Sequence, residues 1–222
     1  MSAEGPLRDG ETAGFELIET LRWEPGGGFL RLPFHLARLE NSARELGFAH
    51  DPAAVDAALK NATDGTSPLR VRLMLARDGT CTATVQPFVP FGPGTVWKLA
   101  IAETRIDAGD PLVRHKTTRR AIYEAARAEF PSTAADEVLL FNSHGFLCEG
   151  TITNVFLKKE RRGPLLTPAL ACGLLPGVLR AEMLASGKVR EAMIGPADLA
   201  TAFEIHVGNS LRGLIPARLG AT

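Results

Sequence analysis

One lysine of this sequence is surrounded by basic side chains, within residues 113–120. A lysine amine attacks a carbonyl group only when its pKa is low enough to leave it neutral, and nearby positive charges lower that pKa. The basic neighbours of Lys116 are Arg114, His115, Arg119 and Arg120. The segment is therefore a candidate for a lysine that forms a Schiff base. A basic cluster at the start of a helix is more often solvated surface, and that interpretation stays open for the segment taken alone.

A carboxylate stands in the apolar stretch of residues 146–157, whose pattern predicts one strand. Because side chains alternate between the two faces of a strand, Glu149 would share a face with Leu147 and Val155. If that face is buried, Glu149 needs a charged or hydrogen-bonded partner. The protonated nitrogen of a pyridine ring would be such a partner. The alternative is that this face looks at solvent.

Residues 172–180 contain Pro176-Gly177 and lead into a predicted helix. Free backbone N–H groups at a helix start, together with the helix dipole, favour a phosphate. Proline and glycine before a helix are also an ordinary turn, so the segment alone does not decide between the two.

A loop at residues 209–213 follows a predicted strand and carries three polar side chains. Asn209 and Ser210 offer amide and hydroxyl donors, and the guanidinium group of Arg212 suits a carboxylate. Asn and Ser in a loop more often serve the turn itself.

The elements that would position these groups fall into two sets. The first is a small mixed sheet with two helices, predicted from alternating strand and helix patterns. Its strands are predicted at residues 14–23, 29–32, 68–76 and 80–86, and its helices at residues 36–46 and from Asp51 onward.

Proline and glycine are densest at residues 87–94, which predicts a domain boundary there. We expect a small N-terminal α/β domain over residues 1–90 and a larger, β-rich C-terminal domain with helices over residues 95–222. The second set has predicted strands at 95–103, 146–157, 189–194 and 203–208, strand turns at 142–145 and 158–163, and helices at 118–129, 176–187 and from Pro196.

The composition predicts a folded chain without a highly charged partner. With 222 residues of which 45% are hydrophobic, the chain can bury a substantial core. Its 25 basic residues balance 25 acidic ones, so we expect neither a nucleic-acid partner nor a membrane partner. With no long apolar run or signal peptide, a cytoplasmic location is expected. The odd number and wide spacing of Cys81, Cys148 and Cys172 predict reduced thiols and no metal site.

Taken together and in this order, the segments resemble the fold-type IV pyridoxal-phosphate enzymes, the class IV aminotransferase superfamily. The resemblance extends over nearly the whole chain. It is carried by Phe34-His35-Leu36-Ala37-Arg38-Leu39, by Lys116, by Glu149-Gly150-Thr151-Ile152-Thr153-Asn154-Val155-Phe156 and by Gly177-Val178-Leu179-Arg180.

The resemblance implies a two-domain fold of mixed α/β class, with pyridoxal 5'-phosphate as the cofactor. Lys116 corresponds to the lysine that carries the cofactor, Glu149 to the glutamate that pairs with the pyridine nitrogen, and Arg38 to an arginine that binds the phosphate. Further phosphate contacts are expected from Gly177, Val178, Leu179, Asn209 and Ser210. Leu179 stands where the family has threonine, so one hydroxyl contact is expected to be absent.

Within the family, residues 115–120 and 172–177 look most like aminodeoxychorismate lyase domains. The aminotransferase branches shape their substrate pocket with tyrosines of the small domain, whereas Tyr123 is the one tyrosine of this chain. A segment that usually precedes the first strand is also missing, so we expect a trimmed small domain. The resemblance thus implies a lyase of folate biosynthesis, which forms 4-aminobenzoate and pyruvate from 4-amino-4-deoxychorismate.

On this hypothesis Lys116 first carries the cofactor and then acts as the general base, while Glu149 keeps the pyridine nitrogen protonated. Arg212 or Arg119 would meet carboxylates of a small-molecule amine substrate. One alternative is an aminotransferase for branched-chain or D-amino acids that uses the same Lys116 and Glu149. A second is a protein that binds the cofactor without turnover. Family members pair as homodimers, and the resemblance implies the same here.

Overall fold

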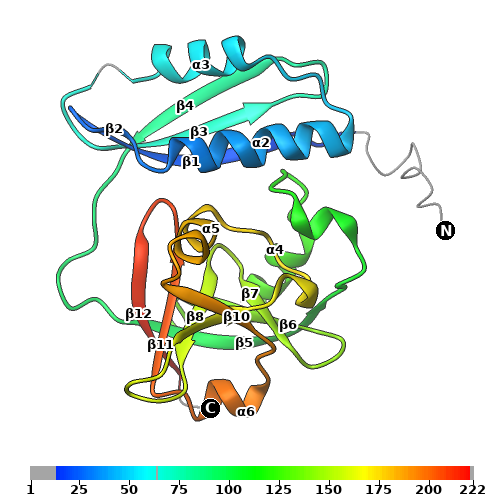
Figure 1. Ribbon diagram of the computed structural model, residues 1–222, viewed down its shortest axis with the longest axis vertical. Coiled ribbons are helices and arrows are strands. Elements are labelled where there is room, and N and C mark those ends of the chain that lie inside the picture. The colour runs from blue at the N-terminus through cyan, green and yellow to red at the C-terminus, as the bar shows by residue number, and fades with distance from the viewer. Residues whose placement is uncertain (1–13, 64, 221–222) are drawn as a thin grey trace.

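The computed structural model describes residues 14–63 and 65–220, which form two β-sheets with helices packed on each (Figure 1). The four-stranded sheet has the order β2-β1-β3-β4, and the eight-stranded sheet has the order β10-β9-β8-β11-β12-β5-β6-β7. The strands are β1 (Leu17–Glu24), β2 (Gly28–Phe29), β3 (Leu69–Leu75), β4 (Cys81–Pro87), β5 (Trp97–Ile106), β6 (Glu137–Asn142), β7 (Leu147–Gly150), β8 (Asn154–Lys158), β9 (Leu165–Pro168), β10 (Val189–Ala192), β11 (Glu204–Asn209) and β12 (Gly213–Leu219). The helices are α2 (Leu32–Leu46), α3 (Pro52–Asn61), α4 (Ala121–Ala128), α5 (Val178–Ala185) and α6 (Pro196–Ala200), with short 3-10 turns η1 (Pro111–Arg114) and η2 (Leu170–Cys172).

Alternation along β3 decides which face of the small sheet is covered by helices. Val71, Leu73 and Leu75 are buried in a core shared with leucines of α2 and α3. Arg70 and Arg72 alternate with them in the sequence and therefore point to the opposite face, because the side-chain period of a strand is two. That face lines a cavity between the two sheets.

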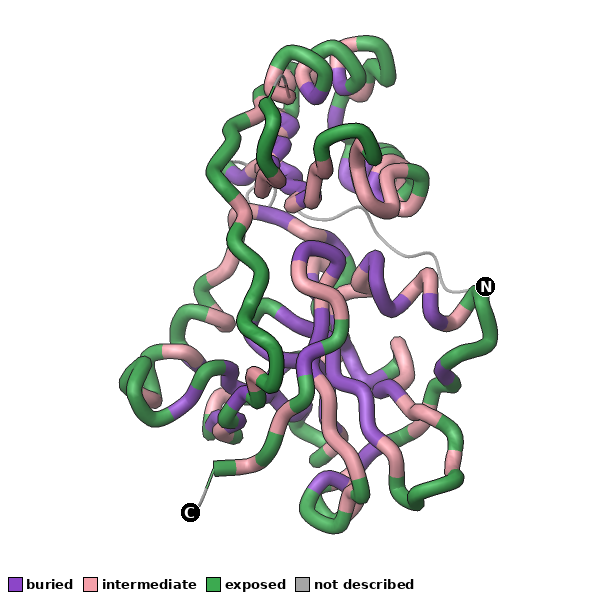
Figure 2. The backbone as a smooth tube through the Cα atoms, turned by 90° about the vertical axis from the view of Figure 1, so that its left-hand side faces the viewer, coloured by how far each residue is buried: buried purple, intermediate pink, exposed green. Residues whose placement is uncertain are grey.

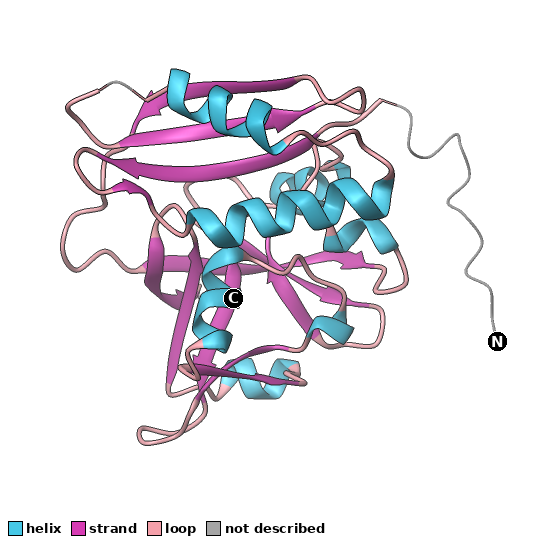
Figure 3. Ribbon diagram, turned by 45° about the horizontal axis from the view of Figure 1, so that its top comes forward, coloured by secondary structure: helices cyan, strands magenta, loops and turns pink. Residues whose placement is uncertain are grey.

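Helix α2 brings polar side chains to the small sheet, along which it lies in Figure 3. Leu39, Ala43 and Leu46 recur at helical spacing and are buried, and His35 is buried on the same helix. Gly47 ends the helix in the left-handed conformation, with its N–H bonded to the carbonyl of Ala43. The buried face of α2 is thus apolar at its C-terminal end and polar near its start.

The eight-stranded sheet encloses the larger core, which is coloured purple in the lower half of Figure 2. Strand β6 is buried along its whole length, as expected for a strand covered on both faces. It pairs in parallel with β5 and antiparallel with β7. This sheet supplies a rigid support for the side chains at its edges.

The two sheets meet where the backbone around Lys116 pairs with β1. The N–H of Ile18 donates to the carbonyl of Lys116 at 2.9 Å, and the N–H of Thr118 donates to the carbonyl of Glu16 at 2.9 Å. Leu17 and Thr117 form an isolated antiparallel bridge between these bonds. Lys116 is therefore held by strand hydrogen bonds to the small sheet.

The single strand predicted at residues 146–157 is wrong, because β7 and β8 are separated by a turn. The buried carboxylate of Glu137 organises this turn by accepting from the N–H of Thr151 at 3.0 Å and of Ile152 at 3.2 Å. It also accepts from the hydroxyls of Thr151 at 2.6 Å and Thr153 at 2.7 Å. The alternation expected across this region is therefore interrupted.

Three other element predictions also differ from the structure. The strand expected at 29–32 is only the two-residue β2, since α2 already begins at Leu32. The helix expected at 118–129 begins at Ala121, because the preceding backbone is bonded to β1. Strand β12 was not predicted, and it contains Pro216, a residue type that disfavours strands.

In the part of the chain that the structure describes, no helix has both the length and the apolar character needed to cross a membrane. The division into domains at residues 1–90 and 95–222 stays a prediction.

We predict that Gly173→Ala lowers the free energy of unfolding by about 2 to 4 kcal/mol. Gly173 has a φ of +82°, and a Cβ atom there would lie 2.5 Å from the Cα of Ala108. Gly92→Ala is the matched control, since a Cβ at Gly92 meets nothing within 4 Å. Urea denaturation measures both variants. Equal stability of the two would contradict the close packing at Gly173.

Candidate active site

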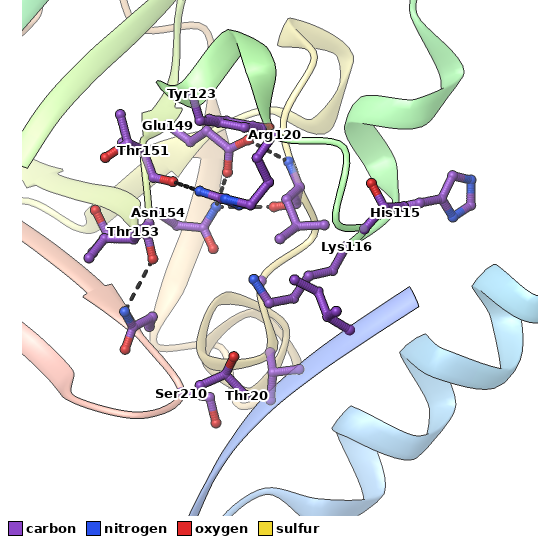
Figure 4. Close-up of a pocket in the computed structure, with 18 of the residues that line it drawn as sticks. Thr20, His115, Lys116, Arg120, Tyr123, Glu149, Thr151, Thr153, Asn154 and Ser210 are labelled. Carbon is purple, nitrogen blue, oxygen red and sulfur yellow. Dashed lines mark hydrogen bonds between the residues drawn. The ribbon is translucent and has the colours of Figure 1, made fainter. Parts of the chain in front are cut away.

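A cavity of about 570 Å³ lies between the two sheets. Its walls come from β1, β3 and α2, from the segment around Lys116, from the turn between β7 and β8, and from the loop after β11. In Figure 4 the Lys116 amine extends into the space between the Glu149 side and the Ser210 side. The structure brings together nearly all of the predicted site residues along this cavity, namely Arg38, Lys116, Arg119, Glu149, Gly177, Val178, Asn209, Ser210 and Arg212.

Leu179 is the predicted residue that lies elsewhere, in an apolar cluster with Phe156 and Met183. Its side chain offers nothing to a ligand, so only its backbone could contribute.

The pKa of Lys116 is lowered to about 8, mainly because burial disfavours the ammonium ion. The charges of Arg38 and Arg120 lower it further. The sequence indicated the direction of this shift but only part of its source. Arg114 is exposed, and His115 turns away to Ser42, with Nδ1 at 3.0 Å from the hydroxyl.

Glu149 is buried with an exposed fraction of 4%, which excludes the solvent-facing alternative. One carboxylate oxygen accepts from the hydroxyl of Tyr123 at 2.8 Å and from the N–H of Leu175 at 3.0 Å. The amide of Asn154 lies 3.4 Å from the other oxygen. Burial raises the pKa of Glu149 to about 7 in spite of these donors. The carboxyl group is therefore suited to share a proton with a ligand nitrogen.

Tyr123 and Arg120 complete this end of the cavity, and the sequence did not assign them to it. The guanidinium of Arg120 donates to the carbonyl of Thr151 and lies 4.8 Å from the ring centroid of Tyr123. Burial raises the pKa of Tyr123, so its hydroxyl stays a donor to Glu149. Both residues follow Lys116 closely, and this proximity is the one signal that pointed to them.

An anion site can form at the opposite end, where α5 begins. No side chain caps this helix, so its first N–H groups are available to a ligand. Gly177 is required there, because a Cβ atom would lie 1.8 Å from the side-chain oxygen of Asn154. Arg38 approaches the same place and donates to the carbonyl of Pro176 at 3.3 Å. Ser210 is buried and lines the same cavity as Arg38 and Gly177.

A buried carboxylate that the sequence did not reveal holds this anion site together. Glu19 receives two hydrogen bonds from Arg38, at 2.8 and 2.6 Å, and lies 2.6 Å from Nδ1 of His35. Nε2 of His35 is in turn 2.7 Å from the hydroxyl of Ser210. Burial alone would raise the pKa of Glu19, but the charge of Arg38 and the hydrogen bonds of His35 and Arg38 lower it to about 2. Glu19 therefore stays ionised and fixes Arg38 and Ser210 in position.

The end of β11 and the loop that follows it contribute three of the predicted residues, Asn209, Ser210 and Arg212. Asn209 uses its amide within the protein, donating to the carbonyl of Ile152 at 3.1 Å and accepting from the N–H of Arg212 at 3.0 Å. The guanidinium of Arg212 lies 5.2 Å from the ring centroid of Phe91 and also lines the cavity. Asn209 thus shapes the loop that presents Ser210 and Arg212.

The family model for amino-transferase class IV matches residues 16–219. The chain belongs to this family of enzymes. Over 202 residues it is 31% identical to a Schizosaccharomyces pombe protein provisionally named aminodeoxychorismate lyase, covering 88% of this chain and 86% of that protein.

Solved structures agree on the fold. One from Mesorhizobium loti, provisionally named an amino-acid aminotransferase, is 55% identical, with a TM-score of 0.90 over 93% of this chain and 100% of the other. The 4-amino-4-deoxychorismate lyase of Pseudomonas aeruginosa is 29% identical, with a TM-score of 0.78 over 99% of this chain and 88% of the other. The fold is that of the fold-type IV pyridoxal-phosphate enzymes.

The class IV family depends on pyridoxal phosphate, and the cavity fits that cofactor. It offers a lysine with a lowered pKa, a buried carboxyl group for a ring nitrogen and an uncapped helix start for a phosphate. Which residues hold the cofactor in this chain stays a prediction.

We predict that Glu19→Gln makes the protein less stable at neutral pH by about 3 kcal/mol, the value of a pKa shift of this size. Since the folded-state pKa of Glu19 is about 2 and its ordinary value 4.5, its contribution is full above pH 4.5 and is lost as the pH falls towards 2. Urea denaturation at several pH values should show the difference between wild type and variant closing in acid. A difference that does not depend on pH would contradict the assignment.

The corresponding substitution of Glu149 by Gln is predicted to stabilise the protein, whereas that of Glu19 destabilises it. Because the folded-state pKa of Glu149 is raised to about 7, its ionisation destabilises the cofactor-free protein progressively as the pH rises from 4.5 through 7. Glu149→Gln should therefore be more stable than wild type by about 3 kcal/mol at alkaline pH and equal to it in acid. Thermal or urea unfolding checks this, and a variant destabilised at alkaline pH would contradict it.

Proposed function

We propose that this chain is a pyridoxal-phosphate-dependent 4-amino-4-deoxychorismate lyase that forms 4-aminobenzoate and pyruvate. The observation that carries the proposal is the similarity to the Schizosaccharomyces pombe protein over nearly the full length of both chains. The absence of any tyrosine on the small-sheet wall of the cavity, within the residues described, also supports it.

The proposal assigns each end of the cavity to one end of the cofactor. Lys116 would carry it, Glu149 would hold a proton at its ring nitrogen, and Arg38 and Ser210 would bind its phosphate with the N–H groups at Gly177 and Val178. When bound, pyridoxal phosphate supplies an electron sink for a carbanion next to the substrate nitrogen.

The remaining chemistry belongs to the side chains of this protein. Once the substrate amine has displaced Lys116 from the cofactor, the neutral amine of Lys116 would take the proton from the ring carbon that bears the substrate nitrogen, which a pKa near 8 allows at neutral to mildly alkaline pH. The C–O bond to the enolpyruvyl group then breaks, and the ring becomes aromatic. Lys116 can return the proton to the departing enolpyruvate, which leaves as pyruvate. Glu149 would keep the ring nitrogen of the cofactor protonated throughout.

A second candidate is an aminotransferase, which the 55% identity to the Mesorhizobium loti protein favours. It would use the same Lys116 and Glu149 but would pass the amino group to a keto acid. A homodimer, in which each small domain helps to cover the partner's cavity, is also proposed from the family resemblance.

We predict a visible absorbance band when pyridoxal phosphate is added to the wild-type protein and no such band for Lys116→Ala. Lys188→Ala, which changes an exposed lysine, is the control and should behave as wild type. The wild type should then release pyruvate from 4-amino-4-deoxychorismate without any keto acid.

The other outcomes separate the alternatives. A band with amino transfer to a keto acid but without pyruvate release would favour the aminotransferase. A band with neither activity would indicate a cofactor-binding protein without turnover. A spectrum that does not depend on Lys116 would contradict the family mechanism for this chain.

A further inference from the structure

Positive charge is in large excess along the cavity. Among the described side chains that line it, seven are lysine or arginine and two are aspartate or glutamate. The cofactor phosphate would neutralise only the group at the start of α5. The surplus cations on the other walls therefore indicate a ligand that brings further negative charge.

Two of these cations stand without partners on the small-sheet wall. Arg70 and Arg72 lie on the face of β3 that is turned to the cavity, where Arg72 is opposite Thr20 of β1. In the described part of the chain, neither guanidinium makes a hydrogen bond or an ion pair. Arg70 is opposite Arg22 of β1, and Arg22 is paired with the carboxylate of Glu24. Arg70 and Arg72 are therefore free to bind a ligand.

A third arginine reaches the same region from the other sheet. Arg212 and Arg70 line the same cavity. Burial lowers the pKa of Arg212, the charge of Arg70 lowers it further, and the charge of Glu137 raises it. Such like charges repel, and a bound anion would remove this repulsion. Each guanidinium can also bind a carboxylate with two parallel hydrogen bonds.

We propose that Arg70, Arg72 and Arg212 form a carboxylate subsite on the small-sheet side of the cavity, and that the substrate is an amine with two carboxylates. This inference rests on the proposed function and deepens it. The substrate of the lyase reaction carries a ring carboxylate and an enolpyruvyl carboxylate, whereas a branched-chain amino acid carries one carboxylate and an apolar side chain. An apolar side chain would leave the guanidinium groups of this wall without hydrogen bonds, at a cost to binding.

The test is the binding of chorismate to the cofactor-loaded protein, measured by calorimetry. Chorismate has both carboxylates but a hydroxyl in place of the amine, so its binding does not depend on turnover. Benzoate serves as the probe with one carboxylate. We expect Arg70→Gln and Arg72→Gln each to weaken chorismate binding about tenfold or more, the value of a hydrogen bond to a charged group, and benzoate binding much less.

Two control variants accompany this experiment. Arg218→Gln changes an exposed arginine of β12 outside the cavity and should bind chorismate as the wild type does. Arg72→Lys keeps the charge but not the paired hydrogen bonds and should give an intermediate affinity. The cofactor absorbance of each variant reports whether the rest of the cavity is intact.

The outcomes distinguish this inference from the proposed function. Unchanged chorismate binding in Arg70→Gln and Arg72→Gln would overturn the subsite, even if the wild type releases pyruvate. An equal loss of chorismate and benzoate binding would overturn it as well, since the subsite would not select for two carboxylates. A selective loss of chorismate binding would support the subsite, even if pyruvate release fails and the lyase proposal falls with it.

Discussion

The arrangement of this site depends on lowering the pKa of one lysine amine. Burial and the charges of Arg38 and Arg120 lower the pKa of Lys116, and these causes together draw on both sheets. Arg38 comes from α2 on the small sheet, Arg120 precedes α4 on the large one, and the Lys116 backbone is hydrogen-bonded to β1. The hydrogen bonds between β1 and the Lys116 backbone therefore place the lysine in the cavity between the two sheets.

Two buried carboxyl groups divide this cavity into ends of different character. Glu19 accepts hydrogen bonds from the guanidinium of Arg38 and keeps its charge, so it can hold Arg38 and His35 at an anion site. Glu149 has neutral donors as its hydrogen-bond partners, and burial raises its pKa to about 7. The same residue type thus serves as a fixed counter-charge at one end and as a proton-sharing group at the other. A cofactor with a phosphate group for the first end and a basic ring nitrogen for the second would match this arrangement.

The sequence alone predicted the fold class, most elements and a set of candidate residues that meet in space. Lys116, Glu149 and Arg38 carry motif signals, and turn and helix patterns are local, so both can be read from the chain. Glu19 and Glu137 could not be found in this way, because a carboxylate in a strand shows its partners only after folding. Strand β12 was missed for a related reason, since its pairing with β11 and β5 outweighs the local effect of Pro216.

The most direct test of the central claim is to find where pyridoxal phosphate attaches. The protein is mixed with the cofactor at mildly alkaline pH, reduced with borohydride and digested, and the modified peptide is identified by mass spectrometry. A lysine with a pKa near 8 should react before the exposed ones, so the cofactor mass is predicted on Lys116. Modification spread over exposed residues such as Lys60, Lys98 and Lys188, with Lys116 unmodified, would contradict the account.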